Sequence, residues 1–169
     1  MIEKYKNTVI YLLIGVGVII SILLLDRWIL PQKTIEDTLI GYRVLTSTRS
    51  TQFGTSKVYI ADRYYTALGN DFTIDIDRPI KDTEITITQS MLFKNINTLK
   101  NQSHDYTNKL TSGFNGVFLL FTHIIACSIL ISLGLLMSNR KLSKNQFQNI
   151  ILFNGFMIFI TLYLWALYN

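Results

Sequence analysis

Three aspartates are the residues of this chain best suited to hold a metal ion. Asp71, Asp75 and Asp77 lie in the segment DFTIDID, in which apolar and polar residues alternate. This alternation predicts a strand with one buried face, and it places the three carboxylates together on the opposite face. Carboxylate oxygens are the usual ligands of hard cations such as Ca²⁺. The competing interpretation is a solvated strand face, which is favoured by Arg78 and Lys81 nearby and by the absence of a calcium-loop motif.

A second candidate for chemistry lies in an apolar segment, where His123 precedes Cys127 by four residues. On a helix these two side chains share one face, where a soft metal or a haem would find ligands. A haem between helices normally has two axial ligands, and no other apolar segment contains a histidine. The chain has one cysteine, and it lacks a nucleophile elbow, a phosphate-binding loop, a paired-histidine zinc motif and a Cys-x-x-Cys pair. We therefore predict no catalytic residue and no cofactor.

The sequence contains three long apolar segments, one of which holds His123 and Cys127. They run from Thr8 to Leu25, from about Gly116 to Met137 and from about Asn149 to Tyr168, and none carries a charged side chain. A helix needs about 20 apolar residues to cross a bilayer. The chain is 49% hydrophobic and only 16% charged, which fits this interpretation. We predict transmembrane helices within residues 1–30, 113–138 and 149–169, with a loop at 139–148 and a separate domain at 31–112.

The distribution of lysine and arginine predicts how these helices are oriented. Lys4 and Lys6 precede the first helix, and the connection between the last two carries Arg140, Lys141 and Lys144 without an acid. By the positive-inside rule both pieces are cytoplasmic, so the middle domain and the C-terminus are extracytoplasmic. The first segment is interpreted as a signal anchor, because its apolar run is long and no small-residue cleavage site follows it. The expected location is a plasma membrane, with a bacterial inner membrane favoured by composition.

The middle domain has mostly β character, so the predicted fold class is an α+β membrane protein. The runs Leu39 to Ser47, Lys57 to Ala61 and Glu84 to Thr88 are rich in branched and aromatic residues, and the first two resemble the arms of a long hairpin. With the strand at Asp71 to Asp77 they predict a small sandwich or barrel-like sheet. The polar run from Asn97 to Ser112 is interpreted as a tether or a short helix that returns to the membrane.

Polar residues within the apolar segments predict how the helices pack. At about 1.5 Å per residue, Ser21, His123 and Thr161 lie at similar depths in the outer half of the bilayer. We expect them to form one cluster joining all three helices. Asn154 reaches the level of Ser132 in the inner half, which predicts a hydrogen bond within the C-terminal hairpin.

These features favour a non-catalytic function. Three helices with few polar residues are too little for a transport path, and the net charge of +5 is explained by topology rather than by nucleic-acid binding. The leading hypothesis is an accessory or scaffolding subunit whose partners are the lipid bilayer and other membrane-protein subunits. The alternative is a small membrane-anchored module that binds a ligand or cation and acts as a sensor. A membrane enzyme ranks third.

Overall fold

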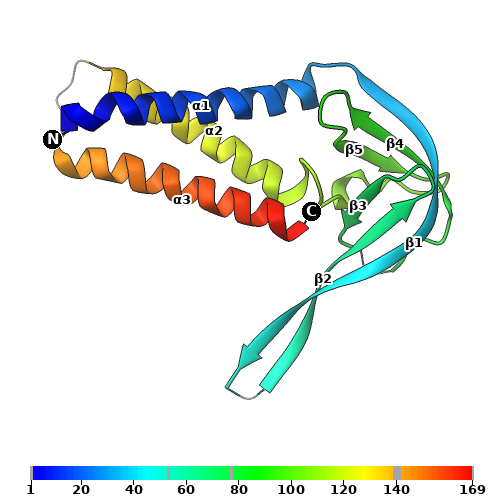
Figure 1. Ribbon diagram of the computed structural model, residues 1–169. Coiled ribbons are helices and arrows are strands. Elements are labelled where there is room, and N and C mark those ends of the chain that lie inside the picture. The colour runs from blue at the N-terminus through cyan, green and yellow to red at the C-terminus, as the bar shows by residue number, and fades with distance from the viewer. Residues whose placement is uncertain (1, 53, 77, 139–141, 169) are drawn as a thin grey trace.

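The computed structural model describes residues 2–52, 54–76, 78–138 and 142–168 and contains two structural parts (Figure 1). Three helices run side by side: α1 (Ile2–Trp28), α2 (Gly116–Met137) and α3 (Lys144–Tyr168). A five-stranded antiparallel sheet lies between α1 and α2 in the sequence and at one end of the helices in space. All three helices are long and apolar enough to cross a membrane. The predicted succession of helix, β-domain and helical pair is therefore confirmed.

The helices pack around α2, which contacts both α1 and α3. Their shared core consists of aliphatic, aromatic and methionine side chains: Leu13, Ile20, Ile125, Ile129, Leu136, Phe147, Ile150 and Met157. Gly17 lies against this core, since a Cβ atom there would sit 3.5 Å from the Ile129 side chain. Only 33% of the α2 span, 17% of the α3 span and 11% of the α1 span are buried. Most of the helical surface is therefore not buried within the described chain.

Helix α3 begins earlier than the sequence analysis predicted, at Lys144 rather than near Asn149. The reason is a capping box at its start. The Gln146 backbone N–H donates to Ser143 Oγ at 3.2 Å, and the Ser143 N–H donates to Gln146 Oε1 at 2.9 Å. Of the predicted loop at 139–148, residues 139–141, which include Arg140 and Lys141, lie outside the described residues.

One long strand organises the sheet, whose order is β3-β2-β1-β4-β5. The strands are β1 (Gln32–Thr51), β2 (Gly54–Thr66), β3 (Asp71–Ile74), β4 (Glu84–Ser90) and β5 (Ile96–Lys100). Strand β1 pairs with β4 over residues 32–38 and with β2 over residues 39–51. Side chains from both flanks meet in one core that contains Tyr64, Phe72, Ile74, Ile85, Ile87, Ile96, Leu99 and Leu110. The structure is thus one bent sheet around one core, rather than two separate sheets.

Several strand predictions need correction. The long hairpin is confirmed, but its strands extend beyond the predicted bounds at Ser47 and Lys57, because the ladder continues through the Thr- and Ser-rich stretch to the pair Thr51 and Gly54. The strand predicted to reach Asp77 ends at Ile74, since the Asp75 N–H donates to Lys109 O at 2.9 Å instead of to β2.

The segment from Asn97 to Ser112 is not a tether. It contributes most of β5 and a short 3-10 helix, η1 (Thr107–Lys109). It also buries Leu99 and Leu110 completely or nearly so in the core of the sheet. The burial of Leu99 and Leu110 was not predicted, because the segment is otherwise polar and the two leucines lie too far apart to make a periodic pattern.

Candidate functional site

The aspartates proposed as metal ligands do not form a binding site in the described part of the chain. Asp71 pairs with Arg63, whose Nε donates to Asp71 Oδ2 at 2.8 Å. Asp75 is exposed beyond the end of β3, and Asp77 lies outside the described residues. No cluster of three histidine, cysteine, aspartate or glutamate side chains suited to a metal occurs among residues 2–52, 54–76, 78–138 and 142–168.

Asp62 on β2 is the least satisfied carboxylate of the described sheet. It is 4% exposed, and its Oδ1 atom has no hydrogen-bond partner. Burial raises the pKa of Asp62 above its ordinary value, the Tyr59 hydroxyl opposes this change, and the negative charge of Asp75 adds to it. Sequence reasoning overlooked Asp62 because a single acid in a strand carries no pattern.

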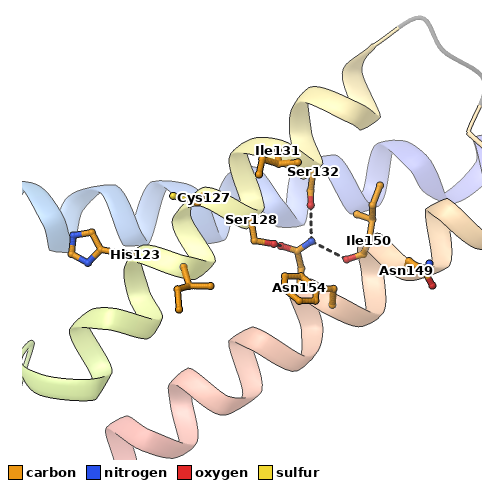
Figure 2. A pocket seen from close by; sticks show the side chains of 10 residues that line it. His123, Cys127, Ser128, Ile131, Ser132, Asn149, Ile150 and Asn154 are labelled. Carbon is orange, nitrogen blue, oxygen red and sulfur yellow. Dashed lines mark hydrogen bonds between the residues drawn. The ribbon is translucent and has the colours of Figure 1, made fainter.

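Asn154 and Ser132, polar residues on the apolar helices α3 and α2, meet as predicted. Asn154 projects from α3 toward α2, where its Nδ2 donates to Ser132 Oγ at 2.8 Å (Figure 2). Ser128, one turn earlier, donates to Asn154 Oδ1 at 3.0 Å, and Asn154 Nδ2 also donates to Ile150 O at 2.8 Å. All three polar side chains are buried. They form a clamp that fixes α3 against α2, and because their hydrogen-bonding atoms are occupied the clamp is structural.

The expected outer cluster of Ser21, His123 and Thr161 does not form. Each side chain bonds a carbonyl one turn earlier on its own helix: Ser21 to Gly17 O, His123 Nδ1 to Leu119 O and Thr161 to Met157 O, each at 2.8 Å. Such local bonds satisfy a hydroxyl or an imidazole without a partner helix. Counting residues gave the depths of these side chains, but it did not give the directions in which they point.

His123 and Cys127 instead line a groove on the outside of the α2–α3 pair. The groove has a volume of about 600 Å³, and its walls come from both helices, with Ile131 on α2 and Phe153 on α3 among them. Figure 2 shows His123 and Cys127 on one helix and Asn149 and Ile150 on the other. Both His123 and Cys127 are exposed. The walls are mostly apolar, and a single imidazole and a single thiol do not complete a metal or haem site.

A junction at the end of α1 fastens the helices to the sheet. Asp26, 1% exposed, accepts hydrogen bonds from Ser90 Oγ at 2.6 Å, Leu92 N at 2.8 Å and Phe93 N at 3.1 Å. These three donors come from the end of β4 and the turn that follows it. A charged acceptor with three donors is among the stronger polar contacts available to a protein.

The neighbouring Arg27 completes this junction on the side of α2. Its Nη1 donates to Phe114 O at 2.6 Å, to Asn97 Oδ1 at 2.9 Å and to Asn115 Oδ1 at 3.1 Å. Its guanidinium carbon also lies 5.4 Å from the centroid of the Trp28 ring. The Asp-Arg pair therefore joins the end of α1, the sheet and the start of α2.

The far part of the β1–β2 hairpin extends away from the rest of the sheet (Figure 1). We call residues 46–51 and 54–59 the arm. All twelve are exposed, with a ladder that runs from the pair Thr46 and Tyr59 to the pair Thr51 and Gly54. Strand β4 stops pairing at Thr38 and β3 begins pairing at Asp62. Both outer edges of the arm consequently have no strand beside them in the described structure.

No protein-family model matches this chain, and comparisons with curated proteins and with solved structures find no similar protein.

Proposed function

We propose that this protein is a non-catalytic accessory subunit of a larger membrane assembly. Its three helices are inserted in the bilayer, and its sheet domain lies on the extracytoplasmic side. The observation that carries the proposal is His123, which is exposed on the outer surface of the helices in the groove between α2 and α3.

A histidine at this depth is costly to leave in contact with lipid. His123 follows the start of α2 by seven residues, which corresponds to roughly 10 Å of helix. Ionisable side chains within membrane spans normally face protein or a water-filled cavity. Within the described residues only its Nδ1 is bonded, to Leu119 O. A helix of a partner protein that fills the groove would remove His123 from lipid and offer its other ring nitrogen a hydrogen bond.

The low burial of the helices supports the same proposal. Even α2, the central helix, buries only 33% of its span within this chain. Transmembrane helices associate through close packing and hydrogen bonds, because hydrocarbon supplies no hydrophobic driving force between them. The α2–α3 groove provides concave packing surface for one more helix, and the Asn154 clamp keeps its two walls at a fixed separation.

Extraction of a tagged chain in a mild detergent, followed by quantification of the proteins that co-purify, tests this proposal. We expect one or more membrane proteins in a fixed ratio to this chain. Replacement of Cys127 by Trp would fill the groove and release them. Leu12→Trp, which enlarges an exposed side chain on α1, serves as the matched control and should retain them. A parent chain that purifies alone or only with copies of itself contradicts the proposal.

A further inference from the structure

The arm is the part of the described sheet that is only two strands wide. Neither face of the arm is apolar: one face carries Thr48 and Lys57, and the other carries Arg49 and Ser56. A two-stranded hairpin without a buried face is at best marginally stable in water. The threonines and serines keep the strands extended. Besides the ladder, the arm is held by hydrogen bonds from Thr51 Oγ1 to Gly54 O at 3.1 Å and from the Tyr59 hydroxyl to Ile76 O at 3.2 Å, and none of these contacts buries an apolar face. A third strand would supply the missing stabilisation.

The open edges of the arm define how such a strand would bind. Beyond Thr38 on β1 and before Asp62 on β2 the ladder is two strands wide, so backbone N–H and C=O groups face outward along both edges. An extended segment of another protein can add to such an edge through main-chain hydrogen bonds. Cross-strand neighbours at about 5 Å then determine which side chains are favoured.

Charge determines which segment fits. Between Asp37 and Asp62 the sequence contains Arg43, Arg49 and Lys57 and no acidic residue. Arg49 and Lys57 make no side-chain hydrogen bond or ion pair in the described structure. Two copies of the arm placed edge to edge would bring like charges together, which disfavours self-association. An incoming strand with aspartate or glutamate would instead neutralise these cations.

We propose that the arm is a docking site for an extended acidic segment of a partner protein, which adds as a third strand to one of its edges. This inference rests on the proposed function and specifies how the extracytoplasmic domain contacts the assembly. Basic side chains on an exposed edge also protect a strand from aggregation. In this chain the same charges select against a second copy and in favour of an acidic strand.

Site-specific photocrosslinking in intact membranes tests the inference. A photoreactive residue is placed at Thr48 in the arm and, as a matched control, at Leu68, which is 64% exposed in the turn after β2. We expect Thr48 to crosslink to one protein, within a segment rich in aspartate and glutamate, and Leu68 not to do so. The double variant R49E/K57E should lower the yield of this adduct about tenfold, whereas R49K/K57R should preserve it.

The inference is overturned if Thr48 crosslinks to lipid, to a second copy or to nothing, or if charge reversal leaves the adduct unchanged. Thermal unfolding of R49E/K57E that matches the parent chain shows that a lost adduct reflects lost docking and not a misfolded domain. Failure of this inference is distinguishable from failure of the proposed function. If the parent chain co-purifies with membrane proteins in a fixed ratio while the arm fails these tests, only the docking site is wrong.

Discussion

The strongest prediction concerns Asp26, whose carboxylate accepts three hydrogen bonds from the end of β4 and the following turn. Asp26→Ala removes the acceptor from the Ser90 hydroxyl, whose residue is 3% exposed, and from the N–H groups of Leu92 and Phe93, which are 58% and 50% exposed and can bond water instead. Each unsatisfied buried donor costs about 1 to 3 kcal/mol, and such costs are not fully additive. Because one of the three donors is buried, we expect a total loss of about 2 to 3 kcal/mol in the free energy of unfolding.

The assay is thermal unfolding in detergent micelles, with Trp28 as the reporter because it lies two residues from Asp26. Replacing Trp165 by Phe leaves Trp28 as the single tryptophan. For a chain of 169 residues the expected loss lowers Tm by about 4 to 12 °C. Asp26→Asn should give an intermediate loss, since one carboxamide oxygen remains able to accept a hydrogen bond.

A matched control is Asp82→Ala, which removes an exposed carboxylate that accepts hydrogen bonds from Asn101 and Ser103 at 3.0 Å. Surface changes of this kind typically stay within about 0.5 kcal/mol. If Asp26→Ala also stayed within that range, the junction would contribute no net stability, and the account of how the sheet is attached to the helices would be refuted.

Two further predictions concern the other buried polar groups. Asn154→Leu should weaken the α2–α3 hairpin by about 1 to 2 kcal/mol, at about 0.6 kcal/mol or more per hydrogen bond. The measurement is the detergent composition at which the hairpin separates. Thr161→Val removes only a bond within α3 and should have almost no effect, so equal effects of the two variants would contradict the clamp. Burial raises the folded-state pKa of Asp62. The free energy of unfolding should therefore fall as pH rises from the unfolded-state pKa of about 3.9 through the folded-state pKa. Asp62→Asn should remove this loss and be stabilising at pH 7 but not at pH 3, and a variant that is no more stable than the parent chain at either pH would contradict the predicted direction of the pH dependence.

Patterns among neighbouring residues were sufficient to predict the three helices, one core strand and one contact between helices. The long apolar segments identify the three helices. Alternation in Glu84 to Thr88 correctly places Ile85 and Ile87 in the core, where they are 3% and 0% exposed. The level of Asn154 relative to Ser132 follows from the constant rise of a helix. In each case a short repeat in the sequence corresponds directly to a repeat in the structure.

The features that sequence reasoning missed depend on partners distant in the chain. Asp26 and Ser90 are 64 residues apart, and no spacing rule connects the end of an apolar helix to a turn in a sheet. Leu99 and Leu110 anchor a segment whose composition is otherwise polar. The outer polar cluster failed for a different reason, since side chains at equal depth can still point around the helix axis in different directions.

The short connections and hydrogen bonds of the junction determine where the arm starts. Only residues 29–31 separate α1 from β1, and Gln32 Nε2 donates back to Arg27 O at 2.7 Å. On the other side, Asn115 Nδ2 donates to Ile96 O at 2.7 Å and to Ser112 O at 2.9 Å, directly before α2 begins. The sheet is thus hydrogen-bonded to both of the helices that adjoin it. If the helices are embedded in a bilayer, the base of the arm lies at a set height relative to that bilayer. A partner that binds both the α2–α3 groove and the arm would therefore meet two sites in a set geometry, and binding at one site raises the effective concentration at the other.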